Sequence, residues 1–498
     1  MGDVDKVTGI APGQGGHIGP PLRVRGYMGN AHRTDILVIG GGPGGYAAAF
    51  RAADLGKQVT IVEVGSRLGG TCLLRGCIPS KALLHLTSLK AEAREAASWG
   101  LSFDEPKIDL DKIRSWKNGI IKRLSGGLSS LAKQRKVDHI QGRVRFINSQ
   151  SVTVEDNAEV SSIDFNHAII ATGSRPAILP TFALDSPRIL DSTTALDLAD
   201  IPERILVVGG GVIGLELGAV YAELGSEAIV VEATPEILPG IDRDLVRPLQ
   251  NRLKKVFKSI HGNTRVTHVE LVQDGLEISF DGDLVAQHQM FDRILLSVGR
   301  TPNTDSLGLE NTKVELDSHG FILTNSQMKT RDEHLYAIGD VVPGPGLAHK
   351  AAHEGHVAAE VLAGENAAFD AIIPAVVYTD PEIACCGLTE TQARAQNTSI
   401  EIARFPWAAS GKAATLGRTE GLTKVIFEPH TNRVLGVGIV GPHAGDLIAE
   451  GVLAVEMAAV AEDLAHSIHP HPTLAESIGI AAEIQLGSAT DLYMPKRK

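Results

Sequence analysis

Two glycine-rich turns, each placed between a buried strand and a helix, constrain the fold of this chain more than any other feature. The first follows the apolar run 35–39 and reads Gly-Gly-Gly-Pro-Gly-Gly from residue 40. The second follows the apolar run 205–208 and reads Gly-Gly-Gly-Val-Ile-Gly from residue 209. An acidic residue ends the next strand of each copy, Glu63 and Glu232, at the same spacing of 23 positions (40 to 63 and 209 to 232). The chain therefore carries one strand–helix–strand unit twice.

The roles of the three glycines in such a unit make this repeat informative. The first glycine forms the turn, the second lets the backbone approach a pyrophosphate, and the third lets helix and strand pack closely. The helix N-terminus then faces the phosphates, and the acid accepts a hydrogen bond from a ribose hydroxyl. One such motif is weak evidence, whereas two copies with the acid in place predict two dinucleotide sites rather than two turns that bind nothing. The predicted binding residues are Gly40, Gly42, Gly45 and Glu63 in the first unit, and Gly209, Gly211, Gly214 and Glu232 in the second.

Glu232 further predicts that the second dinucleotide is NAD. A 2′-phosphate on the ribose would lie against this carboxylate and be repelled. No arginine cluster follows it, because the next residues are Ala-Thr-Pro.

Charge and cysteine usage narrow the class of protein. The formal net charge of −12 disfavours a nucleic-acid or anionic-membrane partner, and no apolar run of 18 or more residues predicts a membrane span. Four cysteines in 498 residues are too few for a secreted disulfide scaffold. Residues 1–33 contain acids, glycines and prolines without an apolar core, which predicts a flexible tail rather than a targeting signal. We therefore expect a cytoplasmic protein, with the mitochondrial matrix as the alternative.

Cys72 and Cys77 lie in a short segment, 69–81, that follows the first unit directly. A bridge between them would close a small, exchangeable loop at a helix start near Pro79, where a thiolate is stabilised, and Lys81 is a candidate cation. A metal site would need further soft ligands nearby, and no metal is expected. Two unpaired buried thiols stay open as an alternative. The adjacent Cys385 and Cys386 are predicted to be buried free thiols.

His471 lies between two prolines near the C-terminus, which restricts its backbone and suits a positioned base. Thr473 and Glu476 have the spacing of a capping box that opens a helix. From the local sequence alone, a capping role for Glu476 and an ordinary surface histidine at position 471 are the better interpretations.

The cysteine segment resembles the active-site signature of the class I pyridine nucleotide–disulfide oxidoreductases, and the resemblance covers about residues 34–490. Ile-Pro-Ser-Lys after Cys77 and the His-x-His-Pro-Thr form resemble the branch of the family that oxidises dihydrolipoamide rather than its glutathione-reducing branch. Leu74 and Arg75 between the cysteines depart from the family pattern, as does His353. The other matching segments are 171–173, 298–303, 336–340, 347–350, 378–382 and 469–476.

The resemblance implies FAD at the first site, NAD at the second, and a homodimer with shared active sites. Cys72 and Cys77 would form the redox-active disulfide, and Lys81 would approach the flavin and pair with Glu216. His471, held by Glu476, would act as the base on the partner subunit's cysteines. Lipoyl domains and the acyltransferase core of a 2-oxoacid dehydrogenase complex, or a glycine-cleavage carrier protein, would be its partners. The remaining implied contacts are Thr172, Gly173, Asp340, Leu347, Ala348 and His349 for FAD, and Glu216 and Gly299 for NAD.

The predicted fold class is α/β, with two Rossmann-like dinucleotide-binding domains and a C-terminal α+β dimerisation domain. We expect an FAD-binding domain at 34–176, an NAD-binding domain at 177–305, a segment at 306–373 that completes the FAD domain, and the dimerisation domain at 374–498. The predicted function is NAD-dependent oxidation of dihydrolipoamide. Another disulfide reductase of the family and a non-catalytic flavoprotein are the alternatives.

Overall fold

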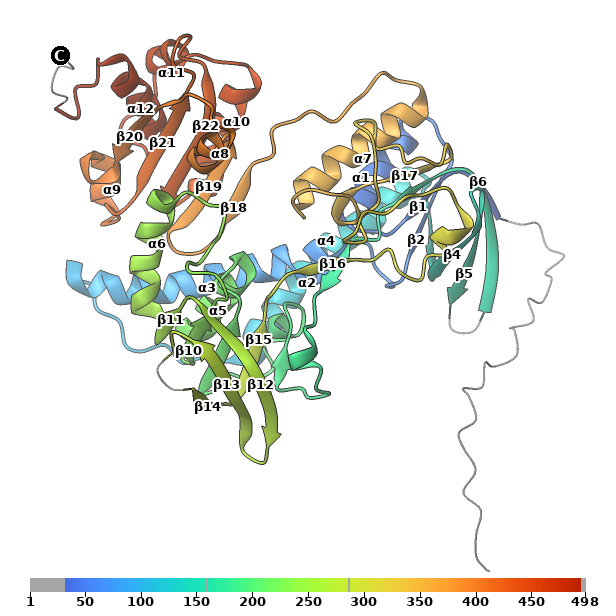
Figure 1. The fold of residues 1–498 in the computed structure, drawn as a ribbon, viewed down its shortest axis with the longest axis horizontal. Coiled ribbons are helices and arrows are strands. Elements are labelled where there is room, and N and C mark those ends of the chain that lie inside the picture. Colours follow the sequence, from blue (N-terminus) through green and yellow to red (C-terminus); the bar gives the residue numbers. More distant parts are fainter. Residues whose placement is uncertain (1–31, 157–158, 285–286, 494–498) are drawn as a thin grey trace, which may run out of the picture.

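A computed structural model describes residues 32–156, 159–284 and 287–493 of the chain. Figure 1 shows three packed parts, drawn in blue to cyan and yellow to orange, in green, and in orange to red. Two parts contain parallel sheets and the third an antiparallel sheet, which confirms the predicted fold class. The tail predicted for residues 1–33 lies outside the described residues up to residue 31, and a strand already begins at His32.

The central strands of the first parallel sheet are apolar and largely buried, as expected for strands covered on both faces. Its parallel strands are β3 (Asp138–Gln141), β2 (Val59–Glu63), β1 (His32–Ile39), β6 (Glu159–Ile170) and β17 (Leu335–Ala337), and β5 (Ser151–Asp156) and β4 (Arg143–Asn148) extend it as an antiparallel hairpin. Helices α1 (Pro43–Asp54) and α7 (Ala348–Ala363) pack against each other on this sheet. Residues that follow 330 therefore complete a sheet begun at residue 32.

The second parallel sheet repeats this unit. Its strands are β11 (Ser259–His261), β10 (Glu227–Val231), β9 (Arg204–Val208), β15 (Arg293–Leu296) and β8 (Ile189–Leu190), with α5 (Val212–Leu224) after β9. The third glycine of each motif explains why helix and strand approach so closely. A Cβ on Gly45 would lie 1.9 Å from the carbonyl oxygen of Gly40, and one on Gly214 would lie 2.1 Å from that of Gly209. No other residue type fits at these two positions.

Two short strands connect the parallel sheets. The chain leaves the first sheet through β7 (Ser174–Pro176) and returns through β16 (Arg300–Pro302), and these strands pair with each other. Between them, the antiparallel strands β12 (Thr264–Val272), β13 (Gly275–Gly282) and β14 (His288–Phe291) extend from the second part. The crossing places the ends of both sheets next to each other.

The C-terminal part is an antiparallel sheet packed against helices α10 (Ala444–Glu456), α11 (Ala461–His466) and α12 (Glu476–Leu486). Cys386 faces this core and is buried, whereas Cys385 points to the opposite face and is only half-buried, because side chains alternate along a strand. The prediction of two buried thiols is therefore wrong for Cys385. The strand order is β18 (Ala375–Val377), β19 (Glu382–Gly387), β22 (Val434–Gly441), β21 (Leu422–Phe427) and β20 (Glu401–Pro406).

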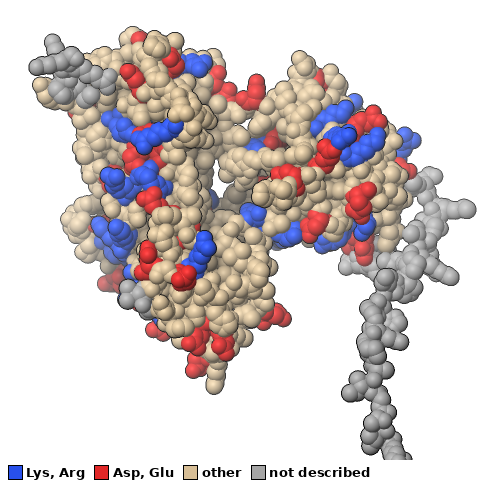
Figure 2. Space-filling view, in the orientation of Figure 1, with Lys and Arg blue, Asp and Glu red and all other residues tan. Residues whose placement is uncertain are grey.

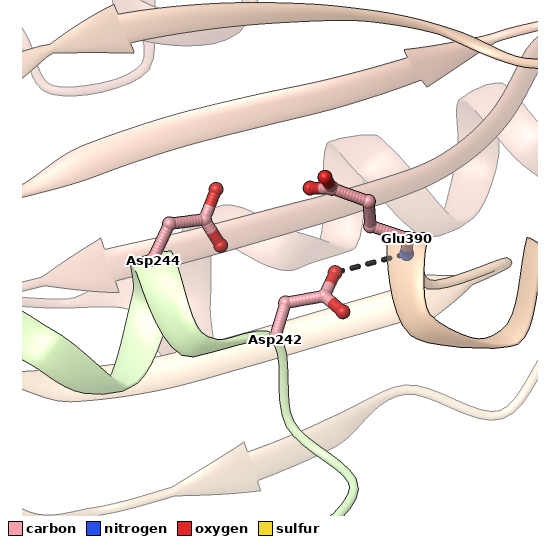
Figure 3. A group of neighbouring side chains, drawn as sticks. All are labelled: Asp242, Asp244 and Glu390. Atoms are coloured by element: carbon pink, nitrogen blue, oxygen red, sulfur yellow. Dashed lines mark hydrogen bonds between the residues drawn. The ribbon is translucent and has the colours of Figure 1, made fainter. Parts of the chain in front are cut away.

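A buried ion cluster joins the second part to the third. Asp242 and Asp244 at the start of α6 (Arg243–Val256) converge with Glu390 at the start of α8 (Glu390–Gln396), as Figure 3 shows. Their carboxylates lie as close together as metal ligands would, but the Lys424 ammonium lies 2.7 Å from each aspartate, and Arg404 pairs with Asp244 and Glu390. These two cations offset most of the acidic charge, so the cluster acts as an interdomain joint.

Acidic and basic side chains are intermixed over the visible face of all three parts in Figure 2. Among the described residues, no helix combines the length and the apolar character that a bilayer span requires.

Candidate active site

Cys72 and Cys77 lie on either side of a tight turn between two helices. Cys72 belongs to α2 (Gly70–Arg75), and Cys77 is the first residue of α3 (Cys77–Ala96), two positions before the helix start expected at Pro79. The helix begins earlier because a proline in the first turn needs no backbone donor. A Cβ on Gly76 would lie 2.9 Å from the carbonyl oxygen of Thr71, so glycine allows the two cysteines to face each other. Both are free thiols in the structure.

The two thiols have opposite acidities. A hydrogen bond from the Cys72 thiol and the nearby Lys81 charge lower the pKa of Cys77 to about 7, against the effect of burial. The start of α3 adds a favourable dipole. The same hydrogen bond, together with burial, raises the pKa of Cys72 above its ordinary value. The reduced pair therefore holds one proton on Cys72 and a thiolate on Cys77 near neutral pH.

Lys81 lies one helical turn after Cys77 and connects the cysteine pair to two other parts of the fold. Its Nζ donates to Oε2 of Glu216 on α5 at 2.7 Å, the pairing that the sequence resemblance implied. Oε1 of Glu216 accepts from the backbone N–H of Tyr378 at 2.9 Å, so this carboxylate faces Lys81 and Tyr378. Sequence reasoning gave Tyr378 no role, although the residue belongs to the matching segment 378–382.

The first glycine-rich turn fits the pyrophosphate of a dinucleotide such as FAD. Gly42 directly precedes α1 with φ −76° and ψ −176°, and no side chain caps the helix, so its first N–H groups are free for an anion. Glu63 accepts from the N–H groups of Gly41 at 2.6 Å and Gly65 at 2.9 Å. The carboxylate predicted to reach the ribose is thereby held at the edge of the turn.

The second turn has the same geometry and fits a second dinucleotide, NAD. Gly211 directly precedes α5 with φ −81° and ψ −177°, again without a side-chain cap, and a Cβ on it would meet no atom within 4 Å. Glu232 accepts from Gly210 N–H at 2.7 Å and Thr234 N–H at 2.9 Å. Gly299, the other glycine predicted for NAD, has φ +127° at the start of β16 and is equally open.

Asp340 belongs to a hydrogen-bonded chain that sequence reasoning missed. Its Oδ2 accepts from Ser174 Oγ at 2.6 Å, and this hydroxyl accepts from Nε of Arg300 at 2.7 Å. The contact joins the end of the first sheet to both crossing strands. Arg300 directly follows Gly299 within a matching segment, which was the available signal.

The other residues predicted for FAD surround the same edge of the first sheet. Thr172 donates to the carbonyl of Asn303 at 2.7 Å, and Gly173 accepts from Asn303 N–H. Leu347 precedes α7 and Ala348 begins it, whereas the exposed His349 ring bonds to the Pro374 carbonyl.

The C-terminal histidine segment carries an exposed imidazole. Nδ1 of His471 lies 2.8 Å from Oε1 of Glu476, and the His471 side chain is 78% exposed. Only one of the two contacts of the predicted capping box forms. The Thr473 hydroxyl donates to the Pro470 carbonyl, and α12 begins without a side-chain cap. Glu476 makes the other contact, accepting from Thr473 N–H with its second oxygen, and so combines this backbone contact with orienting the imidazole.

His469 anchors the loop that carries His471. Its Nε2 lies 2.7 Å from Oε1 of Glu450 on α10, and its ring packs on Gly479 of α12, where a Cβ would lie 2.8 Å from Nδ1. Among the described residues of this chain, no hydrogen bond or ion pair joins His471 to the cysteine turn.

Comparisons with known proteins all place the chain among the pyridine nucleotide-disulphide oxidoreductases. Residues 34–355 match the model of the pyridine nucleotide-disulphide oxidoreductase family, and residues 373–482 match the dimerisation domain of that family. Proteins named dihydrolipoyl dehydrogenase from Vibrio parahaemolyticus and Haemophilus influenzae are each 47% identical over 468 residues, which is 94% of this chain and 98% of each relative. The crystal structure of LpdA from Mycobacterium tuberculosis superposes with a TM-score of 0.84 at 28% identity, covering 91% of this chain and 100% of that chain.

Proposed function

Because the chain belongs to the pyridine nucleotide-disulphide oxidoreductase family, we propose that it oxidises protein-bound dihydrolipoamide to lipoamide as a dihydrolipoyl dehydrogenase. The enzyme uses FAD and NAD, and NAD⁺ is reduced to NADH. One observation carries the proposal: two cysteines of opposite acidity face each other at the start of α3, next to the first glycine-rich turn.

The cysteine pair acts by thiol–disulfide exchange. A substrate thiolate attacks the Cys72 sulfur of the oxidised bridge, a mixed disulfide forms, and Cys77 leaves as a thiolate. The low pKa of Cys77 makes it the better leaving group, because the negative charge is stabilised there. The second substrate thiolate then attacks the substrate sulfur of the mixed disulfide, which releases lipoamide and expels Cys72 as a thiolate; Cys72 takes up the proton that the base removed from the substrate and becomes the thiol. Two electrons have then passed from substrate to enzyme.

His471 and Glu476 manage the protons of this exchange. Glu476 accepts from Nδ1–H, which leaves Nε2 free to take a proton from a substrate thiol. When bound, FAD would supply the redox chemistry that links the cysteine thiols to NAD⁺. Gly40, Gly42, Gly45, Glu63, Lys81, Thr172, Gly173, Asp340 and 347–349 would hold FAD, and Gly209, Gly211, Gly214, Glu232 and Gly299 would hold NAD.

The oligomer and its surroundings form part of the proposal. A homodimer in which His471 serves the partner's cysteines is supported by the matching dimerisation domain and by the exposure of this imidazole. We also propose the domain limits 34–176 and 306–373 for FAD binding, 177–305 for NAD binding and 374–498 for dimerisation. Lipoyl domains and the acyltransferase core of a 2-oxoacid dehydrogenase complex, or a glycine-cleavage carrier protein, would supply the substrate. By analogy with its bacterial relatives, the cytoplasm is the proposed compartment.

A substrate panel tests the function directly. The purified holoenzyme should reduce NAD⁺ with dihydrolipoamide and, in reverse, oxidise NADH with lipoamide. Oxidised glutathione with NADH or NADPH should give a negligible rate. Preferential turnover of glutathione would reassign the protein within the family, and a flavoprotein that turns over neither disulfide would contradict an enzymatic role.

A further inference from the structure

The Lys81 ammonium is enclosed by groups from three segments of the chain. Its Nζ lies 2.7 Å from Oε2 of Glu216, 3.3 Å from Oγ of Ser80 and 4.4 Å from the centroid of the Tyr378 ring. A cation within about 6 Å of an aromatic ring centroid is attracted to its face. Tyr378 therefore contributes a contact to the cation next to the cysteine pair.

Glu216 ties the ring and the ammonium to each other. One carboxylate oxygen accepts from Lys81 and the other from Tyr378 N–H, and the residue is 3% exposed. A buried carboxylate with both oxygens engaged cannot rotate without losing a hydrogen bond. The Glu216 carboxylate therefore fixes the Lys81 ammonium and the Tyr378 backbone relative to each other.

The contacts join the C-terminal part to a pair of packed helices. Lys81 lies on α3, which packs against α5 of the second part, where Glu216 lies, and Tyr378 directly follows β18 of the C-terminal sheet. The Tyr378 ring also packs near the start of α10, since a Cβ on Gly445 would lie 3.5 Å from it. The location of the ring is therefore set by the C-terminal part.

Several groups act on the ionisation of the Cys77 thiol, and they do not all act in the same direction. The Cys72 hydrogen bond and Lys81 favour its thiolate, whereas Glu216 disfavours it. The balance depends on the position of Lys81, whose side chain is 31% exposed and has solvent as an alternative. The other charged or titratable groups that face Cys77 are Tyr46 on α1, Arg300 on β16 and Tyr378.

We propose that Tyr378 is a positioning residue for Lys81, whose ring keeps the ammonium beside Cys77 and so makes the dithiol site depend on the docking of the C-terminal part. The inference rests on the proposed function only in taking Cys77 as the reactive thiolate. It assigns no proton transfer to Tyr378, because its contact with Lys81 is made by the ring face.

The test compares Tyr378→Leu with Tyr378→Phe in the dithiol-reduced holoenzyme. The rate of Cys77 alkylation by iodoacetamide is followed against pH, and peptide mass spectrometry identifies the modified cysteine. Tyr378→Phe should titrate like the native enzyme, because it keeps the ring. Tyr378→Leu should raise the apparent pKa by about half a unit to one unit. In a Lys81→Gln background, Tyr378→Leu should have no further effect, since the ring acts through the ammonium.

An unshifted titration in Tyr378→Leu, or an equal shift in the Lys81→Gln background, would overturn the proposal. If Tyr378→Leu does not fold, trifluorophenylalanine at position 378 keeps the ring shape and weakens its negative face, and it should raise the apparent pKa relative to phenylalanine. The titration needs no turnover. If the enzyme does not turn over lipoamide, the titration still tests the role of Tyr378. If the titration shows no shift, the lipoamide assay still tests the proposed function.

Discussion

Nδ1 of His471 lies 2.8 Å from Oε1 of Glu476, while the second oxygen of the same carboxylate accepts from Thr473 N–H. Burial raises the pKa of Glu476, but these two hydrogen bonds outweigh that effect and hold the pKa below its usual range. A carboxylate is an acceptor only, so Nδ1 must carry the proton. The free Nε2 on an exposed ring is the arrangement that a base needs to serve a second subunit.

Replacing the imidazole should slow the dithiol reaction. We expect His471→Gln to lower kcat with dihydrolipoamide by about 10²–10⁴-fold, the usual cost of losing a general base. Oxidation of NADH by an artificial electron acceptor, which needs no dithiol exchange, should be retained. His466→Gln is the control, since His466 is exposed on the same segment. An unchanged rate in His471→Gln would remove the residue from the mechanism.

The two cysteines should differ spectroscopically. We expect Cys77→Ser to lose the long-wavelength absorbance that a thiolate beside oxidised FAD produces in the two-electron-reduced enzyme. Cys72→Ser should show this absorbance before any reductant is added, because Cys77 keeps its thiolate and has no sulfur partner. Visible spectra of the purified variants distinguish the two roles, and a band that persists in Cys77→Ser would reverse the assignment.

Nucleotide choice should depend on the carboxylate after β10. Glu232→Gln keeps an acceptor oxygen for one of the two N–H groups, Gly210 or Thr234, and removes the charge that would repel a 2′-phosphate. We expect the preference for NADH over NADPH in steady-state kcat/KM to fall by roughly tenfold, on the order of one lost charge repulsion. Glu236→Gln, on an exposed neighbour paired with Arg243, should leave the preference unchanged. A native enzyme that prefers NADPH would contradict the second-site assignment.

The interdomain joint should depend on one ammonium. Lys424 is 1% exposed and neutralises Asp242 and Asp244, so Lys424→Met would leave the buried Asp242 carboxylate without a cation, while Asp244 keeps Arg404. Breaking such a pair by removing one partner costs about 3–5 kcal/mol. Chemical denaturation should reveal this loss, while Lys254→Met on the exposed face of α6 should stay close to the native protein. Equal stability of the two variants would show that the joint contributes little.

Acid should weaken the same joint. Burial raises the pKa of Asp242, but hydrogen bonds from Lys424 and Thr391 outweigh it and hold the pKa at about 2. An unfolded aspartate has a pKa near about 3.9, so this stabilisation is complete above pH ~4 and is lost as the pH falls toward ~2. Calorimetry at pH 6 and pH 3 should show a smaller acid-induced drop in Tm for Asp242→Asn than for Asp274→Asn, whose aspartate is exposed. Equal drops would exclude Asp242 as the titrating group.

Features made by neighbouring residues were predictable from the sequence. The glycine turns and the acid after each second strand are local features, because steric limits on the backbone and the period of buried strands fix them. The five-position spacing of the cysteines is also a local feature of the sequence. The resemblance to the family supplied the pairing of Lys81 with Glu216. The local prediction failed for the Thr473 hydroxyl, because it donates to the carbonyl of Pro470, three residues earlier, and does not cap the helix.

The distant contacts that the resemblance did not supply were decided by the tertiary structure alone. Tyr378 meets Glu216 across 162 positions and Lys424 meets Asp242 across 182, and neither contact leaves a periodic trace in the sequence. Each depends on how whole parts of the fold dock, and docking is governed by the combined burial of many apolar side chains. The sequence by itself therefore determined two nucleotide turns, a cysteine loop and Lys81 as its candidate cation, whereas packing brought the Tyr378 ring to that cation.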